Sequence, residues 1–146
     1  MVHKEKKARS EDRTLGTQLL IDLYDCEQGL LDDQKAVERA LVQAARAANA
    51  TVVETVLHRF SPQGVSGVIV IAESHLAVHT WPEHGYAALD VFTCSGRLDP
   101  DRIVEELKRA FSAGRCESRL VMRGPDEFQC SPRPTAFNQE NRHPPS

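Results

Sequence analysis

The sequence predicts an α+β fold, a two-layer sandwich in which an antiparallel or mixed sheet carries its helices on one face. Two observations support this prediction. Only two segments have apolar residues at helical spacing, whereas six short segments have the composition of strands. In chain order these elements read β-α-β-β-β-β-α-β, and two helices are too few to cover both faces of such a sheet.

The first helix is expected over residues 32–48, where Asp32 or Asp33 can act as the N-cap. The second helix follows Asp99 as its cap and is expected to end at Gly114. Runs rich in valine, isoleucine, threonine and aromatic residues predict the strands. These strands are expected at residues 15–24, 51–58, 68–72, 75–81, 86–94 and 117–123.

The chain has 146 residues, which fits one domain. We expect a mobile N-terminal arm at residues 1–14, the domain at 15–130 and an irregular, proline-rich tail at 131–146. The net charge of −3 and the pI of about 6.1 do not indicate a nucleic-acid or membrane partner.

The four cysteines show no C-x-x-C spacing, so neither a disulfide framework nor a zinc ribbon is supported. The charged N-terminus lacks the apolar stretch of a signal peptide, and no apolar run is long enough to span a membrane. A cytoplasmic location is therefore expected.

Candidate chemistry gathers on the hairpin formed by residues 75–81 and 86–94. A turn centred between Glu83 and His84 pairs Trp81 with Tyr86 and places Cys94 beside the Glu73–Ser74 junction. One face of the hairpin is then apolar, with Leu76, Val78, Leu89 and Val91. The other face carries His75, His79, Trp81, Tyr86, Asp90 and Phe92. A thiol, a hydroxyl and an imidazole are thus expected to converge on one end of the hairpin.

Two other interpretations of these side chains are open. The histidines can be half-buried strand residues, and Cys94 can be a small core residue. His75, His79 and Cys94 are also zinc-ligand types, but a further ligand at a recognisable spacing is missing, so no metal is expected.

A long contiguous pattern resembles the prokaryotic S-adenosylmethionine decarboxylase proenzyme family, in its short, metal-independent subgroup. The pattern comprises Ser61-Pro-Gln-Gly-Val-Ser-Gly67, Ala72-Glu-Ser-His-Leu76, Val78-His-Thr-Trp-Pro-Glu83 and Gly85-Tyr-Ala-Ala-Leu-Asp-Val-Phe-Thr-Cys94. The resemblance implies that the precursor cleaves itself between Glu73 and Ser74 into a β chain, 1–73, and an α chain, 74–146. It also implies an (αβ)₂ dimer or a larger assembly.

The resemblance assigns roles to particular residues. Ser74 becomes a covalent pyruvoyl group that forms a Schiff base with the substrate amine, so no other cofactor is expected. His79 is the proton acceptor in processing, Ser66 assists processing, and Cys94 is the proton donor in decarboxylation. The resemblance also assigns Phe60 and Glu83 to the adenine and the ribose of the substrate. Trp81 is a candidate for the sulfonium, because aromatic faces attract cations.

The implied activity is conversion of S-adenosylmethionine to S-adenosylmethioninamine for spermidine and polyamine biosynthesis. The chain departs from the family pattern at Gln18, at Asp25 and at Ser95. These departures leave a pyruvoyl-dependent ornithine or arginine decarboxylase as an alternative. An uncleaved, non-enzymatic homologue is a second alternative.

Overall fold

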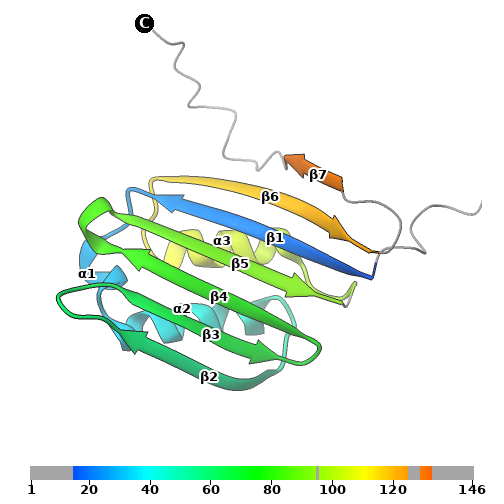
Figure 1. Ribbon diagram of the computed structural model, residues 1–146, viewed down its shortest axis with the longest axis horizontal. Coiled ribbons are helices and arrows are strands. Elements are labelled where there is room, and N and C mark those ends of the chain that lie inside the picture. The colour runs from blue at the N-terminus through cyan, green and yellow to red at the C-terminus, as the bar shows by residue number, and fades with distance from the viewer. Residues whose placement is uncertain (1–14, 95, 125–128, 133–146) are drawn as a thin grey trace, which may run out of the picture.

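The computed structural model describes residues 15–94, 96–124 and 129–132. Seven antiparallel strands form a single sheet in the order β2-β3-β4-β5-β1-β6-β7, and α2 and α3 lie behind one face of it (Figure 1). The strands are β1 Gly16–Tyr24, β2 Val52–Arg59, β3 Val65–Ile71, β4 Ser74–Trp81, β5 Tyr86–Thr93, β6 Arg115–Arg123 and β7 Gln129–Pro132. The helices are α1 Gln28–Leu31, α2 Gln34–Ala47 and α3 Pro100–Ala110, with the 3₁₀ turn η2 at Pro82–His84. The predicted α+β sandwich is confirmed.

The core lies between the sheet and the two longer helices. In β1, Leu19, Ile21 and Leu23 are buried at alternate positions, as expected for a strand with one covered face. Leu41 from α2 and Phe111 at the end of α3 are buried against this sheet face. The opposite face of the sheet carries no helix among the described residues (Figure 1).

Both predicted helices are present, with small differences at their ends. Asp33 caps α2, accepting from Lys35 N at 3.0 Å and from Ala36 N at 3.1 Å, so Asp32 is free for another role. Asp99 caps α3 as predicted. However, α3 ends at Ala110, and the expected end at Gly114 is wrong.

The sequence did not predict α1, η2 or β7. A helix of four residues is too short to show a periodic pattern. Strand β7 extends to Pro132, so the first two residues of the expected irregular tail pair with β6. β3 begins at Val65, three residues earlier than predicted, because glycine and serine hide the strand pattern there. The expected N-terminal arm and the rest of the tail lie outside the described residues.

Candidate active site

The predicted cleavage junction lies in a two-residue turn between β3 and β4, where Ile71 pairs with Ser74. Glu73 has a φ of 65°, a left-handed conformation that costs a residue with a side chain about 1 kcal/mol or more. The Ser74 hydroxyl oxygen is buried and has no hydrogen-bond partner among the described residues. A strained residue thus precedes an unsatisfied buried hydroxyl, which is an unusual combination in a folded protein.

Cys94 lies beside this turn, as predicted. The β4–β5 register pairs His75 with Phe92 and Ser74 with Thr93, which confirms the register expected from the sequence. The backbone N–H of Cys94 donates to the carbonyl oxygen of Glu73 at 3.5 Å. The Cys94 side chain is exposed. The junction, its hydroxyl and a free thiol therefore share one end of the hairpin.

The imidazole at this end belongs to His75, not to His79. The His75 ring stacks on Phe92 with ring centroids 6.0 Å apart. His75 Nε2 also lies 3.5 Å from Asp90 Oδ2. Asp90 Oδ2 accepts in addition from Gln18 Nε2 at 3.5 Å, so Asp90 connects β1, β4 and β5.

Ser66 and His79 form a separate pair at the other end of β4. They are cross-strand neighbours in the β3–β4 ladder, and Ser66 Oγ lies 2.8 Å from His79 Nδ1. His79 lies five positions after Ser74, which corresponds to roughly 16 Å along an extended strand. An odd separation also places the two side chains on opposite faces of the sheet. Within one chain, the predicted proton acceptor therefore does not reach the predicted cleavage site.

The three candidate substrate contacts lie at the same end as His79. Trp81 is exposed, and its ring centroid is 6.4 Å from that of His79. Glu83 is exposed on η2, the turn that directly follows Trp81. Phe60 follows β2 and is 48% exposed, with its ring edge against His58 at 4.6 Å.

Sequence reasoning missed a polar pair on β1 and β5. Tyr86 donates a hydrogen bond to Asp22 Oδ1. Burial and the adjacent carboxylate of Asp22 raise the pKa of Tyr86 above its usual range, so the phenol stays protonated. The ring of Tyr86 also lies between Tyr24, at 5.3 Å, and Trp81, at 5.4 Å. The signal for this pair is the single aspartate in the otherwise apolar run Leu19–Leu23.

Another group of residues missed from the sequence connects the helical layer to the loop after β2. Asp32, just before α2, forms an ion pair with Arg59 at 2.8 Å. Asp32 also accepts from the backbone N–H of Gly64 at 2.9 Å. The sequence suggested Asp32 only as an alternative helix cap. A pair separated by 27 residues leaves no local sequence pattern.

The cleavage turn borders a cavity of about 290 Å³. Its polar lining includes Asn49, Thr51, Glu73 and Arg97. Among the described residues, no group of three or more histidine, cysteine or acidic side chains is arranged to hold a metal ion. The strained Glu73 and the unpaired Ser74 hydroxyl fit a covalent group made from the chain itself at this position.

No helix within the described ranges is long and apolar enough to cross a membrane.

Comparison with known proteins places this architecture in a family. The profile of the family described as S-adenosylmethionine decarboxylase matches residues 17–124. An S-adenosylmethionine decarboxylase proenzyme from Acidithiobacillus ferrooxidans is 49% identical over 112 residues, which cover 77% of this chain and 84% of that protein. The proenzyme from Syntrophomonas wolfei is 52% identical over 112 residues, which cover 77% of this chain and 89% of that protein.

Solved structures agree with this family. The adenosylmethionine decarboxylase from Aquifex aeolicus superposes with a TM-score of 0.69 at 33% identity, over 79% of this chain and 95% of that one. The monomer of Trypanosoma brucei AdoMetDC shares the fold, with a TM-score of 0.52 at 18% identity, over 72% of this chain and 45% of that one. The chain belongs to the S-adenosylmethionine decarboxylase family.

Proposed function

We propose that this chain is a proenzyme that cleaves itself between Glu73 and Ser74, and that the mature protein decarboxylates S-adenosylmethionine to S-adenosylmethioninamine for polyamine biosynthesis. One observation carries the proposal. Glu73 has a positive φ, and the buried hydroxyl of the next residue, Ser74, has no hydrogen-bond partner within the described part of the chain. Relatives of this chain are named proenzymes. The products would be a β chain of residues 1–73 and an α chain of residues 74–146.

Cleavage begins with attack of Ser74 Oγ on the carbonyl carbon of Glu73, which converts the amide into an ester. The N–H of Cys94 already donates to this carbonyl oxygen, so it is aimed at the oxygen that gains charge in the transition state. The resemblance assigns Ser66 to assistance in processing. In the same chain, however, Ser66 pairs with His79, five ladder pairs from the turn.

Removal of the α-hydrogen of Ser74 then expels the main-chain carboxylate of Glu73, which becomes the C-terminus of the freed β chain. Tautomerisation and hydrolysis of the remaining dehydroalanine release ammonia and leave a pyruvoyl group at the start of the α chain. His79 is the proposed base, and the bond to Ser66 Oγ fixes the orientation of its ring.

The separation of His79 from Ser74 favours a site built from two copies of the chain. The sheet face that no helix of the described residues covers offers a surface for a second copy. Val68 and Val70 point away from the helices and are 39% and 41% exposed, and Val56 beside Val68 is 63% exposed. A two-fold axis that runs across the strands would bring the His79 end of one copy over the Ser74 end of the other. We therefore propose an (αβ)₂ dimer with two shared sites.

In the mature protein, the pyruvoyl group supplies a ketone that condenses with the substrate amine and withdraws the electron pair left when CO₂ departs. The exposed thiol of Cys94, beside the new α-chain terminus, is the proposed proton donor to the substrate α-carbon. Phe60, Trp81 and Glu83, contributed by the second copy, are proposed to contact the adenine, the sulfonium and the ribose. We also propose a cytoplasmic location.

The substrate is tested by CO₂ release from the processed protein with S-adenosylmethionine, ornithine or arginine as the only substrate. We expect release from S-adenosylmethionine alone. A Cys94→Ala variant should still cleave, at least in part, but should decarboxylate poorly. Preferential release from ornithine or arginine would overturn the substrate, and full turnover by Cys94→Ala would remove the thiol from the mechanism.

A further inference from the structure

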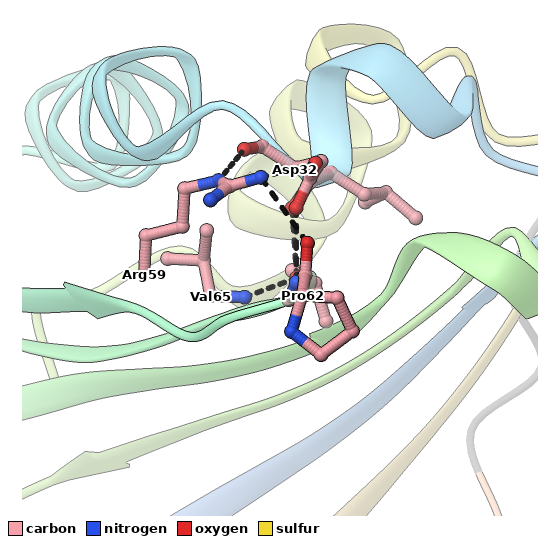
Figure 2. A network of polar contacts seen from close by, with 7 residues as sticks. Asp32, Arg59, Pro62 and Val65 are labelled. Atoms are coloured by element: carbon pink, nitrogen blue, oxygen red, sulfur yellow. Dashed lines mark hydrogen bonds and ion pairs between the residues drawn. The ribbon is translucent and has the colours of Figure 1, made fainter.

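The loop that carries Phe60 is held by a polar network centred on Asp32 (Figure 2). Asp32 Oδ2 accepts from Arg59 Nη2 at 2.8 Å, and the Asp32 backbone oxygen accepts from Arg59 Nε at 3.0 Å. Arg59 Nη2 also donates to the carbonyl oxygen of Pro62 at 3.5 Å. One guanidinium thus bridges the start of α2 and the middle of the loop.

The other carboxylate oxygen of Asp32 acts on the end of the same loop. It accepts from the backbone N–H of Gly64 at 2.9 Å. The carbonyl of Gly64 in turn accepts from the N–H of Phe60 at 2.8 Å, which closes the loop. Gly64 has a φ of 99°, and a Cβ there would lie 3.1 Å from the carbonyl oxygen of Thr80, so this position favours glycine.

A buried threonine holds the residue before Asp32 in place. Thr80 Oγ1 donates to the carbonyl oxygen of Leu31 at 2.8 Å and accepts from the N–H of Val65 at 2.9 Å. Thr80 is 6% exposed and follows His79 in β4. The end of α1 is therefore attached to β3 and β4 beside His79, and Asp32 extends from this fixed point to the loop.

The charge of Asp32 is part of this arrangement. The hydrogen bond from Gly64 and then the bond from Arg59 lower the pKa of Asp32, so it is ionised at neutral pH. Arg59 binds Asp32 through two N–H groups, and such bidentate, charge-assisted hydrogen bonds fix the relative orientation of two residues more strongly than neutral ones do.

We propose that Asp32 is a positioning residue for substrate binding. It fixes the loop from Phe60 to Gly64 and so holds the Phe60 ring in the orientation that binds the adenine. The inference rests on the proposed function, in which Phe60 contacts the nucleoside. Asp32 acts through the loop and does not touch the substrate. The side chain and carbonyl of Asp32 bond to Arg59 and Gly64 and not to Ser74 or Cys94, so loss of Asp32 should weaken binding and leave the chemical step intact.

The test measures KM and kcat separately for Asp32→Ala, Asp32→Asn and a control. Glu106→Gln is the matched control, because it removes a carboxylate that pairs with Arg102 at 3.3 Å on α3, in the helical layer. We expect Asp32→Ala to raise KM for S-adenosylmethionine about tenfold with kcat within about twofold, which corresponds to loss of roughly one charge-assisted bond. Asp32→Asn keeps an oxygen for Gly64 and should raise KM less. Self-cleavage and the control should be unchanged.

A double-mutant cycle with Phe60→Ala separates positioning from general stability. If Asp32 acts through Phe60, adding Asp32→Ala to Phe60→Ala should change KM by less than about twofold. Additive effects, or an unchanged KM in a cleaved Asp32→Ala protein, would overturn the proposal. If Asp32→Ala fails to fold, the Asp32→Asn cycle decides by the same criterion. Failure of the wild-type chain to cleave or to release CO₂ would instead overturn the proposed function.

Discussion

Mixing two inactive variants tests whether the active site is shared between chains. Ser74→Ala removes the attacking hydroxyl, and His79→Ala removes the proposed base. The two residues are five positions apart on β4, roughly 16 Å, so one chain does not bring them together. Each variant alone should stay uncleaved, because every one of its sites lacks either the hydroxyl or the base. A dimer with one chain of each kind has one complete site, formed by Ser74 of the His79→Ala chain and His79 of the Ser74→Ala chain.

The expected yield of this mixture follows from random pairing. Equal expression of the two chains places about half of the His79→Ala chains in mixed dimers, so about half of them should be cleaved. The Ser74→Ala chain should not be cleaved in any dimer. Denaturing mass spectrometry distinguishes the two precursors and their fragments, and an affinity tag on one chain confirms that mixed dimers form.

Two results would refute the reasoning. Cleavage of His79→Ala alone at the wild-type rate would show that His79 is not the base. A complete absence of cleavage in verified mixed dimers would show that Ser74 and His79 must belong to the same chain. Ser66→Ala should behave like a weaker version of His79→Ala, because it removes the partner of the imidazole and leaves the imidazole itself.

Three further predictions concern the stability of the precursor, kept uncleaved by Ser74→Ala and measured by urea unfolding. Gly67→Ala should lower the free energy of unfolding by about 1–3 kcal/mol, because the added methyl would lie 2.5 Å from the Leu57 side chain and 2.8 Å from the Val56 carbonyl oxygen. The control Gly29→Ala should not lower it, because no atom lies within 4 Å of the added methyl. Thr80→Val should cost about 1–3 kcal/mol because it leaves one donor and one acceptor unpaired, whereas Thr80→Ser should retain most of that stability. Burial raises the pKa values of Cys26 and Cys116 from 9.0 to about 11, so the stability that the two neutral thiols contribute is present below pH 9 and is lost as the pH rises towards 11. Replacing both cysteines by alanine should reduce this loss of stability at high pH. An unchanged pH dependence of the free energy of unfolding would contradict the assignment.

The sequence predicted the hairpin correctly because its two faces differ so clearly. A slip of one residue would move Leu89 and Val91 to the face opposite Leu76 and Val78, and the turn centred between Glu83 and His84 excludes larger slips; the structure has the predicted register. The position of Cys94 beside Glu73 follows from the same register. Alternation along a strand is local information, so a single sequence is enough to read it.

The sequence analysis missed that the predicted catalytic residues fall into two groups, although the spacing of Ser74 and His79 along one strand was a signal for it. The face on which each residue lies follows from the sequence. However, the resemblance assigned Ser66, His79 and Ser74 to one process without stating which chain provides each residue. The length of β4 and the pairing of Ser66 with His79 reveal the separation. The Asp32–Arg59 contact was missed for a related reason, since it joins residues 27 positions apart and depends on how α1 docks on the sheet.

The mass of the purified full-length protein under denaturing conditions tests the central claim most directly. For the wild type we predict two chains produced by cleavage between Glu73 and Ser74, with a carbonyl in place of the amino group at the start of the second chain. For the Ser74→Ala variant we predict one intact chain of about 16.3 kDa. A single wild-type chain of 16.3 kDa, or normal cleavage of Ser74→Ala, would contradict the account.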